Sequence, residues 1–337
     1  MQLNLFPISS PVQNQADWVE LKCLSDHFDH VVIDDIRSAM ELQNDTQDDD
    51  IAREDRTLES VIDTVLQEIT ERQKSLQNSY PFQIEEGGRV VSLLTPFKDI
   101  TIDQKVYIYC LIFSHVSRSS LITLDRDVLP ADRDLMQICS TIAAAGLVRG
   151  PSISFGFPRV DRTRFYDKTK QVLVLLGEGE LHELADVNPV HSLSPKDAGI
   201  DIISWKPTAD NRPGKLIYIS QVASGNNWKE KPVKTYIDIL TTYWLKHPIL
   251  SRMLDAIFIP FDMLDDPDNG ITADQFLSSQ MLKLGTIFYR RRIPALFKEG
   301  IDFIQQNQHI FVERVNECDK IHNYVDERIR ALKAVAA

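Results

Sequence analysis

The chain lacks the sequence patterns that would indicate a cysteine metal knuckle, a membrane-spanning helix or a signal segment. Its four cysteines are Cys23, Cys110, Cys139 and Cys318, and they stand too far apart for a Cys-x-x-Cys metal knuckle. No stretch approaches the roughly 18 apolar residues that a membrane-spanning helix needs, and no positively charged, apolar segment opens the chain. We therefore expect a cytoplasmic protein with reduced cysteines and no membrane partner.

Signatures of the common nucleotide and hydrolase sites are also missing. The chain has no Gly-x-x-x-x-Gly-Lys-Ser/Thr loop for phosphates, no Gly-x-Ser-x-Gly elbow and no His-Glu-x-x-His zinc helix. His182 and His191 have no partner at metal-ligand spacing, so they are interpreted as exposed loop residues. This pattern disfavours ATPases and hydrolases of those types.

What the chain does contain is an uneven distribution of charge. Its 337 residues are 43 % hydrophobic, enough for a sizeable core, and carry a formal net charge of −12. Residues 41–60 hold eight acidic residues against Arg53 and Arg56, whereas residues 206–234 hold six basic residues against two acidic ones. Nucleic acid would therefore be bound by a local basic face and not through the net charge.

The first 155 residues are predicted to form a mostly helical domain that regulates the rest of the chain or docks a partner. Apolar residues three and four apart indicate helices within 16–42 and at 103–117 and 133–145. An acidic loop is expected over 44–56, with a helix resuming at about Thr57. A Gly/Pro/Ser-rich stretch that starts at Gly150 marks the boundary, which is placed after residue 155.

Residues 156–337 alternate between helical and extended patterns. A helix that ends at Gly177 precedes two strand candidates, 199–205 and 216–223, which are expected to form a hairpin. An amphipathic segment at 226–245, a strand at 256–261 and helices at 272–284 and 305–332 follow. The predicted fold class is α/β in this domain and α+β overall, with a mixed sheet flanked by helices.

Two polar residues stand at neighbouring ends of the expected hairpin. Asp201 follows Gly199 at the start of the first strand, and Gln221 lies twenty residues later, near the end of the second. A carboxylate and an amide oxygen that converge there would suit Mg²⁺, a hard cation that prefers oxygen ligands. Phosphodiester hydrolysis uses such a cation, together with a nearby lysine that stabilises the phosphate.

This pair of motifs resembles the PD-(D/E)xK nuclease superfamily, particularly its Mrr-like restriction endonucleases, over about residues 160–262. The resemblance implies a core of a helix, a β-hairpin that carries both motifs, a second helix and a further strand. It also implies that Asp201 binds Mg²⁺ or Mn²⁺ together with the Gln221 side-chain oxygen and the Val222 backbone carbonyl. The lysine of the family would fall at position 223, where this chain has Ala223.

The lysine therefore has to come from elsewhere in the chain. Lys231 is preferred and Lys229 is the alternative, because one helical turn after the hairpin would bring either back toward the strand end. The acidic residue on the first helix of the family corresponds to Asp167, with Glu178 and Glu180 as competitors.

Six further residues are expected to contact nucleic acid: Lys215, Asn227, Trp228, Arg290, Arg291 and Arg292. Some of these residue types also have structural roles. A tryptophan beside a Gly-Asn-Asn loop often anchors the loop on the core instead of stacking on a base. Arginines suit phosphate groups, but near a helix end they also interact with the helix dipole. Asp201 has such an alternative too, since aspartate often caps backbone amides at turns.

The predicted function is a magnesium-dependent endonuclease acting on double-stranded DNA, as the effector of a bacterial restriction or anti-phage defence system. Because the chain has no motor motif, a separate sensor or ATPase subunit is expected as a partner, or else self-association. The alternative is a catalytically degenerate nuclease fold that serves as an adaptor or regulatory subunit. Gln221 and Ala223 favour this alternative, since an amide is a poorer magnesium ligand than a carboxylate.

Overall fold

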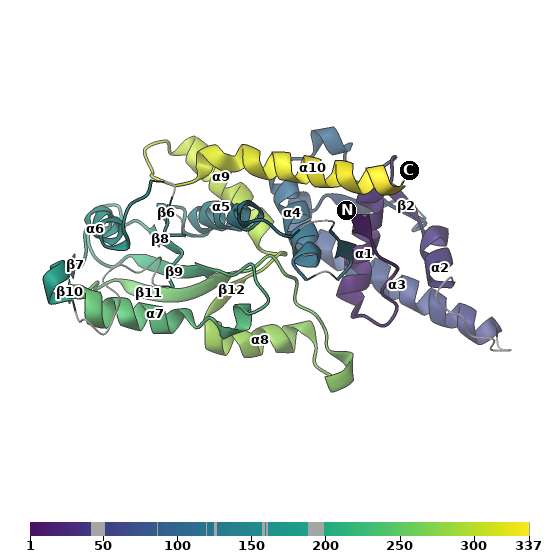
Figure 1. The fold of residues 1–337 in the computed structure, drawn as a ribbon, viewed down its shortest axis with the longest axis horizontal. Helices are drawn as coiled ribbons and strands as arrows, with labels where there is room; N and C mark the ends of the chain where they lie inside the picture. Colours follow the sequence, from purple (N-terminus) through teal and green to yellow (C-terminus); the bar gives the residue numbers. More distant parts are fainter. Residues whose placement is uncertain are drawn as a thin grey trace. The chain divides into compact units, whose positions relative to one another are not determined.

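The computed structural model describes residues 1–41, 51–85, 87–118, 120–124, 127–156, 159, 161–187 and 199–336, with only the backbone for 51–57 and 336. Across these residues the protein combines helices with small antiparallel sheets and one five-stranded mixed sheet (Figure 1). The predicted α+β class is therefore confirmed. None of the described helices is long and apolar enough to cross a membrane.

The chain forms two compact units, each assembled from separate stretches of sequence. The first comprises residues 1–132, 261–277 and 319–337, and the second comprises residues 133–260 and 278–318. The boundary predicted after residue 155 falls inside the second of these units.

Helices dominate the first unit: α1 (Val12–Ser25), α2 (Ile33–Glu41), α3 (Ile51–Leu76), α4 (Ile102–Val116) and most of α10 (Cys318–Ala336). It also holds two small antiparallel sheets, made of β2 (His30–Val32), β4 (Val90–Leu93) and β3 (Phe82–Ile84), and of β1 (Gln2–Leu3) and β5 (Ile122–Thr123). The predominance of helix in this part of the chain agrees with its sequence pattern, which gave no indication of the short strands.

Helix α3 starts earlier than its apolar pattern indicates. It begins at Ile51, so the predicted acidic loop 44–56 is wrong over residues 51–56, while residues 44–50 lie outside the described part of the chain. The apolar stripe of the helix begins only at Leu58, which is buried with Ile62 and Ile69. Four of the six residues between Ile51 and Leu58 are charged, and charged residues have ordinary helix propensities, so these first turns form without a continuous apolar stripe to indicate them.

A buried arginine fixes the helices of the first unit. The Arg72 guanidinium on α3 is fully buried and forms ion pairs with Asp17 at 2.6 Å and Glu20 at 2.7 Å, both on α1. The Tyr107 hydroxyl on α4 donates to Glu20 at 2.8 Å. A network of this kind stabilises the fold only while every partner is present, so it specifies how these helices pack.

The second unit is built on the five-stranded sheet, in the order β12 (Thr286–Phe288), β11 (Arg252–Phe258), β9 (Leu216–Val222), β8 (Ile202–Lys206), β6 (Ser152–Ser154). Strand β8 is antiparallel to both of its neighbours, while β9, β11 and β12 are parallel. The helices of this unit are α5 (Pro130–Val148, from Arg133), α6 (Phe165–Leu176), α7 (Val233–Ile239), α8 (Ala273–Leu284, in part) and α9 (Ile293–Gln306). Beside them β7 (Glu180–Leu181) pairs with β10 (Leu245–His247).

The hairpin expected from the sequence is present as β8 and β9, and the connection from β9 to the parallel strand β11 contains α7. In Figure 1, α5 and α9 lie on one side of this sheet and α7 on the other. Helices α5 and α9 lie so close together that a Cβ atom at Gly146 would be 2.0 Å from the Leu296 carbonyl oxygen. Glycine at this position allows the two helices to approach each other.

Two helix predictions in this half of the chain need correction. The segment 226–245 is not one helix: a 3₁₀ turn (Trp228–Glu230) precedes Pro232, and a π-helical turn (Leu240–Trp244) follows α7. The predicted helix 305–332 is wrong at its start, because α9 ends at Gln306 and α10 begins at Cys318. Between them the chain runs beside β6, where the Glu313 N–H donates to the Ser152 carbonyl at 3.0 Å.

Candidate functional site

Asp201 lies where β8 begins, and it is held against the end of β9. Its backbone N–H donates to the Ser220 carbonyl at 2.9 Å, and its Oδ2 accepts a hydrogen bond from the Val222 N–H at 2.8 Å. Gly199 precedes it with φ +74°, and a Cβ there would lie 2.4 Å from the Tyr236 ring. The glycine therefore permits the turn that brings the half-buried carboxylate to the strand end.

Gln221 is the residue between the two β9 positions that Asp201 contacts. Its side chain is only 5 % exposed, and its Oε1 is buried without a hydrogen-bond partner. A buried acceptor without a partner lowers the stability of a fold by about 1–3 kcal/mol. The Gln221 Oε1 is therefore destabilising unless a ligand binds it. Asp201 and Gln221 thus lie at neighbouring strand ends. Asp201 provides a carboxylate there, and Gln221 provides an amide oxygen without a hydrogen-bond partner.

The residues at this strand end fit a magnesium-type ion by their chemistry. Asp201 offers a carboxylate, Gln221 the amide oxygen that has no partner, and Val222 a backbone carbonyl. No group of three or more His, Cys, Asp or Glu side chains that could hold a metal occurs among the described residues. An ion held here would therefore depend on one carboxylate, neutral oxygens and water, which Mg²⁺ commonly retains.

Neither candidate lysine lies on the strands themselves. Ala223, at the position where the family has lysine, is fully buried, and its N–H donates to the Phe258 carbonyl at 2.9 Å. Lys229 is exposed in the 3₁₀ turn after β9, with its Nζ 5.8 Å from the centre of the Trp228 ring. Lys231 is half-buried and directly precedes Pro232 at the start of α7.

The acidic residue expected on the first helix occupies an outward position. Asp167 on α6 is 41 % exposed and forms an ion pair with Arg164 at 2.7 Å. Its competitor Glu178 is buried and accepts a hydrogen bond from the Ser251 N–H at 2.9 Å, and Glu180 pairs with Lys246 at 3.1 Å. All three carboxylates thus already have a polar partner.

Several residues expected to bind nucleic acid are placed in the interior. Lys215 is fully buried, and its Nζ donates to the carbonyls of Asn211 at 2.9 Å and Arg212 at 2.8 Å. Arg290 and Trp228 are buried as well, so neither a guanidinium nor an indole face is presented to solvent at these positions. We therefore leave Lys215, Arg290 and Trp228 out of any nucleic-acid surface.

The remaining three predicted contacts are at least partly accessible. Asn227 is exposed, whereas Arg291 and Arg292 are half-buried. Arg292 directly precedes α9, and its Nη1 donates to the Ile287 carbonyl at 2.8 Å. The arginine run therefore lies at the positive end of the α9 dipole, so a favourable dipole interaction with this helix is ruled out.

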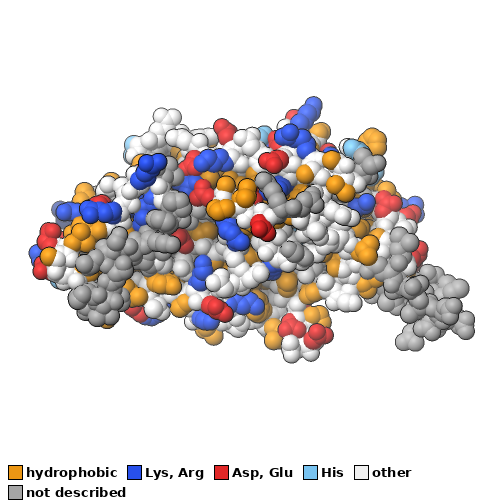
Figure 2. Space-filling view, viewed as in Figure 1, with side chains coloured by type: hydrophobic (Ala, Val, Ile, Leu, Met, Phe, Trp, Pro, Cys, Tyr) orange, Lys and Arg blue, Asp and Glu red, His pale blue; other side chains and the backbone are white. Residues whose placement is uncertain are grey.

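The two units differ sharply in charge. The second contains 22 Lys and Arg against 17 Asp and Glu, a formal charge of +5, while the first contains 15 against 32, a formal charge of −17. Figure 2 shows Lys and Arg side chains interleaved with Asp and Glu on the face drawn there. The unit that holds Asp201 and Gln221 is therefore the one whose charge suits a polyanion.

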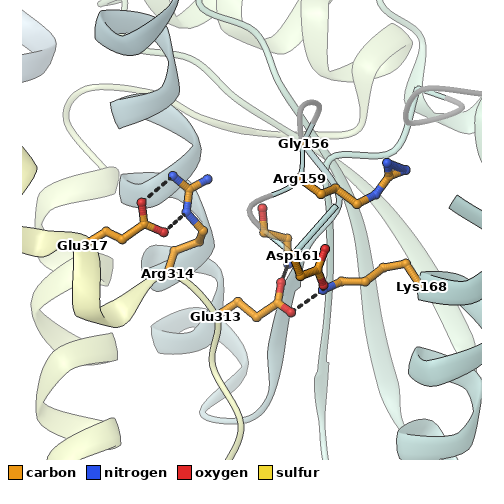
Figure 3. A pocket seen from close by; sticks show the side chains of 8 residues that line it. Gly156, Arg159, Asp161, Lys168, Glu313, Arg314 and Glu317 are labelled. Atoms are coloured by element: carbon orange, nitrogen blue, oxygen red, sulfur yellow. Dashed lines mark hydrogen bonds and ion pairs between the residues drawn. The ribbon is translucent and has the colours of Figure 1, made fainter. Parts of the chain in front are cut away.

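A charged pocket adjoins the β6 edge of the same sheet (Figure 3). Lys168 of α6 is buried there between Glu313 and Asp161, with 3.0 Å to the Asp161 carboxylate. Burial opposes ionisation of Asp161, but hydrogen bonds from Thr163 and Lys168 outweigh it and lower its pKa to about 2. Glu313 also accepts a hydrogen bond from the Ser154 N–H at 2.9 Å, so this cluster ties α6 to the edge strand.

Sequence patterns gave no indication of this pocket, because its residues come from separate stretches. Lys168 and Asp161 are close in sequence, but Glu313, Arg314 and Glu317 lie about 150 residues later. In Figure 3, Arg314 pairs with Glu317, and Lys168 points toward Glu313. Charges of both signs are paired within the pocket, which is typical of a structural cluster.

Comparison of the chain with models of known families, with curated proteins and with solved structures returned no match.

Proposed function

We propose that the protein is a metal-dependent endonuclease that hydrolyses DNA, with its site at the ends of β8 and β9. The observation that carries the proposal is the placement of the Asp201 carboxylate beside Gln221, whose buried Oε1 has no hydrogen-bond partner. A ligand cation would satisfy that oxygen, and the same cation is what phosphodiester hydrolysis needs.

The topology of the second unit supports the same proposal. A helix, a hairpin that carries both motifs, a second helix and a further strand form the core that the resemblance to PD-(D/E)xK nucleases implies, and α6, β8, β9, α7 and β11 follow in that order. The formal charge of +5 on this unit favours a polyanionic substrate, and double-stranded DNA is the substrate that we propose.

Each residue at the site would have a separate role. When bound, Mg²⁺ or Mn²⁺ supplies an activated water and stabilises charge on the phosphate oxygens. Asp201, Gln221 and the Val222 carbonyl would hold the ion, and the Val222 N–H keeps the Asp201 carboxylate oriented. Lys231, or Lys229 in its place, would neutralise the phosphate from the segment that follows β9.

The test is nicking of supercoiled plasmid DNA by the full-length protein with Mg²⁺ or Mn²⁺. Asp201→Asn keeps an acceptor for the Val222 N–H but removes the charge, so we expect cleavage to fall by about 10²–10³-fold. Asp238→Asn is the matched control, because this exposed α7 carboxylate pairs only locally with Lys234 at 2.8 Å. Equal cleavage by the wild type and Asp201→Asn would contradict the proposed site.

The lysine is assigned by a second pair of variants in the same assay. Lys231→Gln and Lys229→Gln each remove one positive charge, and the residue that stabilises the phosphate is the one whose loss slows cleavage without weakening Mn²⁺ binding. Full activity in both variants would show that neither lysine has this role.

We place this nuclease as the effector of a bacterial defence system, in the cytoplasm, under the control of a separate sensor or ATPase subunit. A feature of the first unit favours such a partner. Phe28 is 82 % exposed and lines a groove on the sheet of β2, β4 and β3, together with the acidic residues Glu85 and Asp29, of which Asp29 is paired with Lys333. On a unit with a formal charge of −17, this groove suits a basic segment with an apolar anchor.

That groove also supports the second candidate function, an adaptor subunit without cleavage activity. A labelled peptide of alternating lysine and leucine is a suitable probe, with the glutamate-leucine peptide as its control. We expect binding of the basic peptide only, weakened by Phe28→Ser and by Glu85→Lys, in fluorescence anisotropy. Absence of plasmid cleavage together with this binding would favour the adaptor function, and absence of peptide binding would remove the support for docking at this groove.

A further inference from the structure

Gln137 links helix α5 to the backbone of Asp201. It is 6 % exposed, and its Nε2 donates to the Asp201 carbonyl at 2.8 Å and to the Ser154 Oγ at 3.0 Å. It lies 64 residues before Asp201 in the chain, in a helix that sequence patterns assigned to the N-terminal domain. The structure thus brings a residue from outside the recognised motifs to the candidate site.

Asp201 is held from three elements at once. Besides Gln137, the Phe155 N–H at the end of β6 donates to the Asp201 carbonyl at 2.7 Å. On its other side, Asp201 donates to Ser220 and accepts from Val222, both on β9. A residue whose N–H, carbonyl and carboxylate all have fixed partners has little freedom to reorient.

The space for the Gln137 side chain depends on a glycine. A Cβ atom at Gly156 would lie 2.8 Å from the Gln137 Cδ and 2.9 Å from its Oε1, closer than side chains tolerate. The φ of Gly156 is not in the left-handed region, so steric room and not backbone conformation is what glycine provides here. Positions 137 and 156 are therefore coupled.

We propose that Gln137 is a positioning residue that fixes Asp201 so that its carboxylate remains at the end of β9. The effect of Gln137 on catalysis rests on the proposed function, whereas the effect of Gln137 on the geometry of Asp201 does not. Groups that orient a metal ligand through hydrogen bonds commonly change metal affinity or activity by 10–100-fold when they are removed. Gln137 contacts Asp201 and no other residue of the proposed metal site in the hydrogen bonds that the structure describes.

The test compares Gln137→Met with Thr141→Val in the full-length protein. Thr141 is a buried α5 residue whose Oγ1 donates to the Gln137 carbonyl at 2.7 Å, so its substitution perturbs the same helix without removing a contact to Asp201. Hydrogen exchange at the Val222 amide reports the bond to the Asp201 Oδ2 and needs no metal. We expect exchange there to be about five- to tenfold faster in Gln137→Met, the size of one lost hydrogen bond, and unchanged in Thr141→Val.

A second readout is the dissociation constant for Mn²⁺ alone, measured by calorimetry. We expect it to rise by about 10–100-fold in Gln137→Met and to remain within about twofold of wild type in Thr141→Val. In the Asp201→Asn background, Gln137→Met should have no further effect, because the residue acts through Asp201.

The outcomes separate the two proposals. Unchanged Val222 exchange in Gln137→Met, or equal changes in Gln137→Met and Thr141→Val, would overturn the positioning role. Faster Val222 exchange in a protein that neither binds Mn²⁺ nor cuts DNA would support the positioning role and overturn the nuclease. Additive effects of Gln137→Met and Asp201→Asn on Mn²⁺ affinity would also refute action through Asp201.

Discussion

Replacing Gln221 by methionine should stabilise the protein while weakening its response to divalent cations. The Oε1 of Gln221 is buried without a partner, and methionine is an apolar side chain of similar length that adapts to irregular spaces. Relief of one unsatisfied acceptor is worth about 1–3 kcal/mol. We therefore expect Gln221→Met to raise the free energy of unfolding in metal-free buffer by about 1–2 kcal/mol.

Urea denaturation with and without Mn²⁺ measures both effects. At a hundredfold excess over its dissociation constant, a bound ion adds about 2.7 kcal/mol to the stability of the wild type. If loss of the Gln221 oxygen weakens binding tenfold, the same Mn²⁺ concentration adds only about 1.4 kcal/mol to Gln221→Met. Addition of Mn²⁺ should therefore remove most of the stability advantage that Gln221→Met has over the wild type in metal-free buffer.

The matched control is Ser220→Ala. Ser220 is the neighbouring β9 residue, its Oγ is also buried without a hydrogen-bond partner, and it faces the opposite side of the sheet from Gln221. Its substitution should not change the stabilisation by Mn²⁺. A Gln221→Met protein that is less stable than wild type in metal-free buffer, as loss of a satisfied hydrogen bond would make it, would show that the Gln221 oxygen has a partner. An equal gain in stability from Mn²⁺ in both proteins would show that this oxygen does not bind the ion.

Three other predictions concern substitutions that remove or add one charged side chain in the second unit. The folded pKa of Asp161, about 2, lies below the unfolded value of about 3.9, so its contribution is complete above about pH 4 and is lost as the pH falls toward 2. The difference in urea midpoint between wild type and Asp161→Asn should therefore shrink over that range. Lys215→Met removes the cation that lies 3.6 Å from the buried Glu178 carboxylate. We expect this change to destabilise the fold by about 3 kcal/mol in thermal denaturation. The DNA affinity of the folded protein, measured by filter binding, should not change. Gln221→Glu places a second carboxylate in a buried position, so it should lower metal-free stability at neutral pH yet tighten Mn²⁺ binding in calorimetry; weaker binding would contradict the ligand role.

The hairpin and its polar ends could be predicted because their determinants are local. Apolar runs mark β8 and β9, and Gly199 supplies a positive φ two residues before Asp201. The same local logic indicated a helix after β9, although Pro232 shortens it and a 3₁₀ turn replaces its beginning. Where one short stretch determines the structure, residue type and spacing are sufficient.

Burial of particular charged and aromatic side chains could not be predicted from the sequence. Lys215, Arg290 and Trp228 belong to residue types found at nucleic-acid surfaces, but all three are interior in this fold. Lys215 is tolerated there because two carbonyls and Glu178 surround its ammonium group. The two carbonyls belong to the residues just before Lys215, but Glu178 lies in a separate segment, so a sequence window around the lysine does not reveal its counter-ion.

Contacts that support the candidate site from distant parts of the chain could not be predicted from the sequence either. Gln137 reaches Asp201 from a helix 64 residues upstream, and the sequence around it reads as one more helical turn. The two units also alternate along the chain, so a linear division at residue 155 separates α5 from most of the sheet it packs on. Sequence patterns identify elements, whereas which element supports which site is decided by the tertiary fold.

Gln221 and Ala223 have opposite electrostatic effects when they are compared with a glutamate and a lysine at the same two positions. A site with two carboxylates, one lysine and a divalent cation presents one net positive charge to the scissile phosphate. A site with Asp201, a neutral glutamine, a neutral alanine and the same cation also presents one net positive charge, before the charge of Lys231 or Lys229 is added. Replacing the acid and the lysine together thus preserves the attraction for phosphate, whereas replacing either one would change it by a full unit. For this reason the absence of a lysine at position 223 is a weaker argument against cleavage than it would be beside a glutamate, and metal affinity becomes the decisive measurement.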